Sequence, residues 1–125
     1  MWVYNFREQA LQTGGNVYYN GARPYSEENN PTILAQTDPK LQLLQEPGRF
    51  SLKLKLGSEL KQAPTTEVTT RLLGLAKIPQ LAYEDASGAP LAVNRDFFGR
   101  TRNKKHPTPG PFENPDKGEV TIQLR

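Results

Sequence analysis

The side chains that could carry out chemistry in this sequence are few and widely spaced. The single histidine, His106, lies in a basic run between Arg100 and Pro107. A histidine surrounded by positive charge is a poor metal ligand, and a catalytic histidine base is usually oriented by a nearby carboxylate. We therefore predict that His106 is a solvated loop residue. The serines lack nucleophile-elbow spacing, so none of them is predicted to be a nucleophile.

Paired carboxylates are the more serious candidates, because glycosidic bond cleavage needs only two of them. Neighbouring residues of a strand point to opposite faces, and acidic residues beside Gly or Ser usually form turns. We therefore interpret the acidic pairs as turn formers and surface charge, and we predict no catalytic residue. The Asn and Asp residues also lack the spacing of a calcium loop, so no metal site is predicted. The acidic candidates are Glu27 with Glu28, Glu84 with Asp85, Asp96, and Glu113 with Asp116.

The most distinctive stretch, residues 94–102, combines adjacent phenylalanines with a glycine and three arginines. Phe97 and Phe98 cannot both face inward on a strand, so one of them must be covered by a loop or by a partner. Asp96 is spaced to pair with Arg100 or Arg102. A locked corner, a docking surface for a neighbouring domain and a polyanion-binding loop all fit this pattern. The residues of this candidate docking loop are Asp96, Phe97, Phe98, Arg100, Arg102 and Phe112.

Tyrosine side chains form the other candidate site. Amphipathic aromatic rings can stack on the apolar face of a pyranose sugar, although they also serve in core packing and on strand faces. Both interpretations stay open for this chain. The candidate sugar-binding residues are Tyr18, Tyr19, Tyr25 and Tyr83.

Composition excludes several classes of site. The 125 residues contain no cysteine, which excludes disulfides, thiolate nucleophiles and cysteine-ligated metal centres. No apolar run approaches the ~18 residues of a membrane-spanning helix. The net charge of +3 is scattered along the chain, so we expect no nucleic acid partner, no membrane contact and no cofactor. Residues 1–8 lack the features of a signal peptide, and we expect the chain to be a piece of a longer protein.

Turn signals divide the chain into short extended segments. A hairpin is predicted from residues 41–46 and 49–56, joined by Pro47 and Gly48, because apolar residues alternate with Ser and Lys over residues 50–56. The same alternation predicts a strand over residues 119–125. Shorter strands are expected within 16–21, 32–36, 65–73 and 91–93, and one helical turn within 57–64. Residues 2–6 fit a strand slightly better than a helix.

These segments predict an all-β fold, namely a mainly antiparallel, β-sandwich-like domain with long loops and little helix. The length fits one β-rich domain over residues 1–125. Only 35% of the residues are hydrophobic, and eleven prolines and ten glycines lie between the apolar segments, so we expect a thin core. A homo-oligomer would pair through an edge strand such as 2–6 or 119–125.

Several runs, taken in order along the chain, resemble the C-terminal region of bacterial glycoside hydrolases that are built on a right-handed parallel β-helix and are similar to β-xylosidases. Each run alone is weak, and their order carries the resemblance. The runs are Asn16-Val17-Tyr18-Tyr19-Asn20-Gly21-Ala22, Thr69-Thr70-Arg71-Leu72-Leu73-Gly74, Gly88-Ala89-Pro90-Leu91, Asp96-Phe97-Phe98-Gly99-Arg100-Thr101-Arg102 and Pro109-Gly110-Pro111-Phe112-Glu113.

The resemblance implies a non-catalytic accessory β-domain of a polysaccharide-degrading enzyme. In such enzymes the catalytic carboxylates lie on the β-helix, and no position of this chain matches them. The implied partners are carbohydrate or the catalytic part of a parent hydrolase, and the implied parent is secreted or periplasmic. The alternative is a protein-interaction module that docks through the basic loop 95–112 and an exposed sheet edge.

Overall fold

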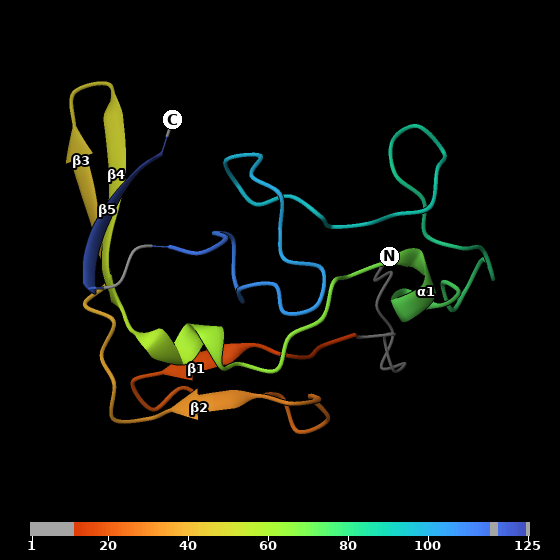
Figure 1. Cartoon of the computed structure of the whole chain (residues 1–125), viewed down its shortest axis with the longest axis horizontal. Helices are drawn as coiled ribbons and strands as arrows, with labels where there is room; N and C mark the ends of the chain where they lie inside the picture. The colour runs from red at the N-terminus through yellow and green to blue at the C-terminus, as the bar shows by residue number, and fades with distance from the viewer. Residues whose placement is uncertain (1–11, 116–117, 125) are drawn as a thin grey trace, which may run out of the picture.

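The computed structural model describes residues 12–115 and 118–124 and shows an all-β fold with little helix, as predicted (Figure 1). A two-stranded parallel sheet and a three-stranded antiparallel sheet make up its regular structure. Long loops connect the remaining segments. The elements are β1 (Val17–Tyr19), β2 (Thr32–Leu34), β3 (Gln42–Glu46), β4 (Arg49–Leu56), the 3₁₀ helix η1 (Ser58–Lys61), α1 (Thr70–Leu73) and β5 (Gly118–Leu124).

The predicted hairpin and C-terminal strand form the larger sheet. β3 pairs with β4 across the Pro47–Gly48 turn, with Glu46 opposite Arg49. Proline presets its own φ for the first turn position, and Gly48 supplies the positive φ of 72° at the second. β5 then pairs antiparallel with the other edge of β4, which gives the strand order β3-β4-β5.

The two faces of this sheet differ sharply in polarity. Residues directly opposite each other share a face, so Leu43, Leu52 and Ile122 lie together, as do Leu54 and Val120. The reverse face carries Lys and Glu side chains, including the ion pair between Lys53 and Glu119 at 2.9 Å. The apolar face is covered only at one end: Leu56 is buried, while Phe50 near the hairpin turn is 39% exposed and Leu43 on the edge strand β3 is 63% exposed.

The β1–β2 pair is parallel, with Val17 opposite Thr32 and Tyr19 opposite Leu34. A tight turn follows β1. Asn20 and Gly21 both have positive φ, and the Ala22 N–H donates to the Tyr19 carbonyl at 3.0 Å. Asn and Gly are the residues that adopt this backbone conformation at least cost. The turn thus ends β1.

The core lies where the two sheets approach each other. Val17 and Tyr19 of β1 and the leucines of β4 line a shared apolar groove of about 270 Å³. The hydrophobic residues that the structure buries within residues 12–115 and 118–124 are Leu56, Leu60, Ala63 and Phe112. A core this small agrees with the thin core expected from the composition.

Two predicted strands are wrong. Residues 65–73 contain α1 at their end instead of a strand, because the Thr69 hydroxyl caps the turn by accepting from the Leu72 N–H at 3.2 Å. Residues 91–93 make only an isolated bridge, between Ala92 and Thr69. The predicted helical turn within 57–64 is confirmed by η1. The strand expected at 2–6 lies outside the described residues.

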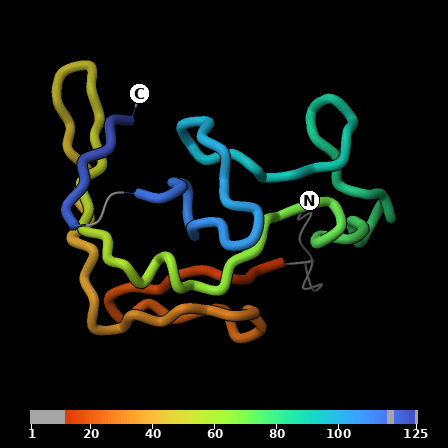
Figure 2. Tube along the Cα trace, in the orientation of Figure 1, coloured from red at the N-terminus to blue at the C-terminus, as the bar shows by residue number. Residues whose placement is uncertain are grey.

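The chain path brings distant segments together beside the core. Figure 2 shows the start of the described chain running alongside the segment that follows η1, with the loop that ends near residue 110 above them. Residues 75–90 extend away from this junction as an open loop region (Figure 1). No helix within the described residues is long and apolar enough to cross a membrane.

Candidate functional site

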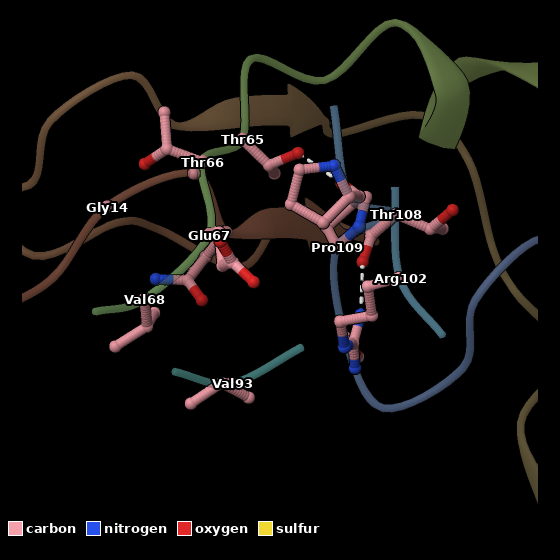
Figure 3. Close-up of a pocket in the computed structure, with 13 residues that line it drawn as sticks. Gly14, Thr65, Thr66, Glu67, Val68, Val93, Arg102, Thr108 and Pro109 are labelled. Carbon is pink, nitrogen blue, oxygen red and sulfur yellow. Dashed lines mark hydrogen bonds between the residues drawn. The ribbon is translucent and has the colours of Figure 1, made fainter. Parts of the chain in front are cut away.

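A small polar pocket lies where three loop segments meet. We call it the Glu67 pocket; it is lined by residues 14–16, 65–68 and 107–110, together with Val93 and Arg102 (Figure 3). Its volume is about 180 Å³. Prolines and valines supply apolar wall, while threonine hydroxyls, a carboxylate and a guanidinium supply polar groups. The pocket therefore combines apolar surface with hydrogen-bonding groups, as small-molecule sites commonly do.

Gly15 allows two of these segments to approach closely. A Cβ atom at this position would lie 3.1 Å from the Thr65 Cγ2 atom and 3.2 Å from the Pro64 carbonyl oxygen. The φ of Gly15 is +67°, which side-chain-bearing residues rarely adopt. The Thr65 hydroxyl donates to the Pro107 carbonyl and joins the third segment to the other two. The pocket floor thus depends on a glycine and on one threonine.

Arg102 holds the opposite wall in place. Its guanidinium donates to the carbonyl oxygens of Arg95 at 3.1 Å, Thr108 at 2.9 Å and Gly110 at 2.8 Å. It also lies 3.7 Å from the carboxylate of Glu113, and both side chains are almost fully buried. A guanidinium that spans three carbonyls fixes the loop 108–110 against the strand-like segment before it.

Glu67 faces this wall across the pocket (Figure 3). The segment that carries it is held by the Val93 N–H, which donates to the Val68 carbonyl at 2.9 Å. No hydrogen bond or ion pair within the described residues engages the Glu67 carboxylate or the Thr66 hydroxyl. Glu67 is partly buried, so its oxygen atoms are available to a ligand that can donate hydrogen bonds.

The predicted docking loop is a locked corner centred on Asp96. The Asp96 carboxylate accepts from the backbone N–H groups of Phe98 at 2.9 Å, Arg100 at 2.8 Å and Glu113 at 3.0 Å. Arg100 adds an ion pair at 2.7 Å, as the sequence predicted. Burial opposes ionisation of Asp96, but these hydrogen bonds outweigh it and lower the pKa of its carboxyl to about 2.

This corner presents aromatic side chains. The Phe98 ring stacks on Phe112 with centroids 5.6 Å apart, and Phe97 meets both rings edge to face. Arg100 lies 5.5 Å from the Phe98 centroid. Phe112 is buried, whereas Phe97 and Phe98 are 55% and 51% exposed. The structure therefore brings together all six residues of the candidate docking loop, and two of its three phenylalanines remain half exposed.

The four candidate tyrosines do not form one platform. Tyr18 and Tyr19 are adjacent in β1, so their side chains point to opposite sides. Tyr18 donates to Glu28, and this hydrogen bond, with burial, raises the pKa of its phenol. Tyr19 lines the apolar groove, where burial and the Glu59 carboxylate raise its pKa. Tyr25 accepts from the Glu28 N–H at 3.0 Å and so lies near Tyr18.

Tyr83 lies in a different region, where its carbonyl accepts from the Thr70 hydroxyl. Among the acidic candidates, Asp85 accepts from Ser87 and Ala89 and forms a turn, as predicted. His106 is exposed in the loop. Within residues 12–115 and 118–124, no three His, Asp or Glu side chains are grouped as a metal ion would require.

The sequence reasoning missed Glu67 and the threonines around it. Threonine and valine favour strands, so the sequence predicts a strand for the run Thr65-Thr66-Glu67-Val68. A partial signal was present, since Pro64 precedes the run and Gly74 follows it, and both residues punctuate loops. The contact that builds the pocket joins residues 65 and 107, and no local pattern encodes a pair so far apart.

The fold and this pocket define an all-β domain with a small polar site between its loops. The chain is similar to a solved structure described as "The complex structure of XylC with xylose", with a TM-score of 0.76 and 26% sequence identity. The similarity covers 88% of this chain but 17% of that one, so the chain spans less than a fifth of the length of its neighbour. No protein-family model and no curated protein sequence matches the chain.

Proposed function

We propose that this chain is a carbohydrate-related, non-catalytic accessory β-domain of a larger sugar-processing protein. The observation that carries the proposal is its similarity to XylC, whose structure was solved with xylose. Because that similarity covers most of this chain and a small part of the neighbour, it fits one module of a longer protein. In this proposal residues 1–125 form a single β-rich domain that contacts sugar or the catalytic part of the parent protein.

The environment of the acidic residues supports a non-catalytic role. Both oxygen atoms of Asp96 accept hydrogen bonds from the loop that it closes. Glu113 accepts from the Thr108 N–H at 2.9 Å and lies beside Arg102. A general acid would need a raised pKa, and Asp96 has a lowered one. These two carboxylates therefore stabilise loops in our proposal. The resemblance to the C-terminal region of β-helix glycoside hydrolases fits the same role.

Two measurements on the full chain test this function. Saturation-transfer NMR with xylobiose and xylotriose is expected to show transfer to the sugar protons, and absence of transfer at millimolar sugar would refute the carbohydrate contact. Incubation with an aryl β-xyloside is expected to release no phenol above the buffer blank. Turnover that survives repeated purification would instead make the chain an enzyme and refute the accessory role.

A second function, docking to a neighbouring protein domain, is favoured by one observation. Phe97 and Phe98 are half exposed on a corner that Asp96 holds rigid, and rigid exposed aromatics beside arginine are common in binding hot spots. Arg95, Lys104 and Lys105 lie close to them along the chain, and Arg100 lies over the Phe98 ring, so an acidic partner surface fits best. An exposed edge of the β3-β4-β5 sheet would extend this contact.

Light scattering tests the docking function. If the corner is a docking surface, its exposed phenylalanines are expected to cause self-association of the isolated chain at high concentration and high salt, where repulsion between two basic corners is screened. Phe98→Ser is expected to reduce that association. The matched control is Ile78→Ser, which removes an apolar side chain that is 90% exposed in another loop. A strictly monomeric chain, or equal effects of the two substitutions, would count against docking through this corner.

A further inference from the structure

The Glu67 pocket is the place in this structure where a ligand would meet unused hydrogen-bonding groups. The Glu67 carboxylate is partly buried and has no partner within the described residues. Hydrogen bonds hold the segment that carries Glu67 at both of its ends. A partly desolvated carboxylate is stabilised by a ligand that brings donors to it. Two donors at neighbouring positions suit its two oxygen atoms best.

The charge balance of the pocket argues against an anionic ligand. Arg102 is the cation in the wall, and hydrogen bonds within the described residues already use three of its five N–H groups. Glu113 lies beside it at 3.7 Å and offsets its charge. Glu67 adds a negative charge that would repel phosphate or carboxylate ligands. A neutral molecule rich in hydroxyl groups fits these conditions.

The volume of the pocket and the chemistry of its walls further restrict the class of ligand that it can bind. Sites for drug-sized molecules have volumes of roughly 300–1,000 Å³, whereas the Glu67 pocket has about 180 Å³. It therefore suits one sugar ring and not an oligosaccharide. Val68, Val93 and Pro109 give apolar surface for the C–H groups of such a ring, and Thr66 is also among the lining residues.

We infer that the Glu67 pocket binds a single neutral pyranose ring, with the Glu67 carboxylate accepting hydrogen bonds from two adjacent sugar hydroxyls. This inference rests on the proposed carbohydrate-related function and assigns it to a site other than the tyrosines. A ligand of this size with few contacts is expected to bind with a dissociation constant in the millimolar range.

Titration of the ¹⁵N-labelled full chain with D-xylose tests the inference. The expected result is that amide signals of Gly14, Gly15, Thr66 and Glu67 shift together and saturate. Glu67→Gln keeps the shape but halves the acceptor capacity, and it is expected to weaken binding about tenfold. The matched control is Glu84→Gln, which changes an exposed carboxylate in another loop. A dispersed amide spectrum of each variant shows that it is folded.

The outcomes separate this inference from the broader function. Amide shifts that cluster at Tyr18 and Tyr25, or sugar binding that survives Glu67→Gln, would refute the assignment of the sugar site to the Glu67 pocket. The broader carbohydrate-related function would remain in place. Saturation transfer to xylobiose without any shift near Glu67 would do the same. Absence of binding to every sugar by both methods would overturn both proposals. A larger response to methylammonium chloride than to xylose would identify a cation site and overturn the inference.

Discussion

Replacing Arg102 with methionine is expected to remove the main tie between the loops of the pocket. The substitution deletes donors to three carbonyl oxygens at 2.8–3.1 Å and leaves the Glu113 carboxylate almost fully buried beside an apolar side chain. Removing one partner of a buried ion pair typically costs about 3–5 kcal/mol, because the remaining charge stays desolvated. We expect a loss of unfolding free energy in this range.

Urea denaturation followed by circular dichroism measures the loss. With an m value of about 2 kcal/mol/M, a loss of about 4 kcal/mol moves the midpoint down by about 2 M urea. Domains of this kind have total stabilities of roughly 5–15 kcal/mol, so Arg102→Met is expected to leave a marginally folded protein. The matched control is Arg95→Met, because Arg95 donates from its guanidinium to one exposed carbonyl.

The double variant Arg102→Met with Glu113→Gln separates charge from packing. Glutamine at position 113 removes the buried charge, so the two losses are expected to be non-additive by about 1 kcal/mol or more. If Arg102→Met costs less than about 1 kcal/mol, or if the two substitutions are additive, then the assignment of Arg102 as a buried structural tie is refuted.

Three further predictions concern single features of the fold. The folded-state pKa of Asp96, about 2, lies below its ordinary value of 3.8, so the contribution of Asp96 to stability is present above about pH 4 and is lost as pH falls through 2. The thermal unfolding temperature should therefore fall between pH 5 and pH 2, and Asp96→Asn should make this fall smaller; parallel pH curves for the variant and the parent chain would contradict this. Gly15→Ala should cost more than Gly21→Ala in urea denaturation, because both sites have positive φ but only Gly15 has neighbours within 4 Å of an added Cβ; equal costs would show that the close approach is unimportant. Leu43→Ser removes an exposed apolar side chain, so it should lower the binding of a hydrophobic dye while changing the unfolding free energy by less than about 1 kcal/mol. Unchanged dye binding would indicate that the dye does not bind to the uncovered sheet face.

Local patterns in the sequence were sufficient to predict the strands of the larger sheet. The alternation over residues 50–56 and the Pro47–Gly48 turn each act over a few residues, and β3 and β4 form where these signals predict. The pairing of Asp96 with Arg100 is local for the same reason, since the two residues are four apart on one corner.

The same local patterns did not predict features that depend on contacts between residues distant in the sequence. The burial of the alternating leucines could not be predicted, because cover for β4 comes from η1 and from Phe112 and ends before the hairpin tip. Threonine-rich residues 65–70 favour a strand locally, but the Thr69 cap and the contact of Thr65 with Pro107 hold them in a loop and a helical turn. Tertiary contacts overrode strand propensity here.

The position of β5 beside β4 affects how the protein is made. Residues 57–117 separate the two strands, so β4 acquires its second neighbour only after this whole stretch has left the ribosome. Until then one edge of β4 offers unpaired backbone groups to any other extended chain nearby. Pairings between strands so distant in sequence also form slowly. Chaperone demand during synthesis should therefore be highest in the interval between the emergence of the β3–β4 hairpin and the arrival of β5.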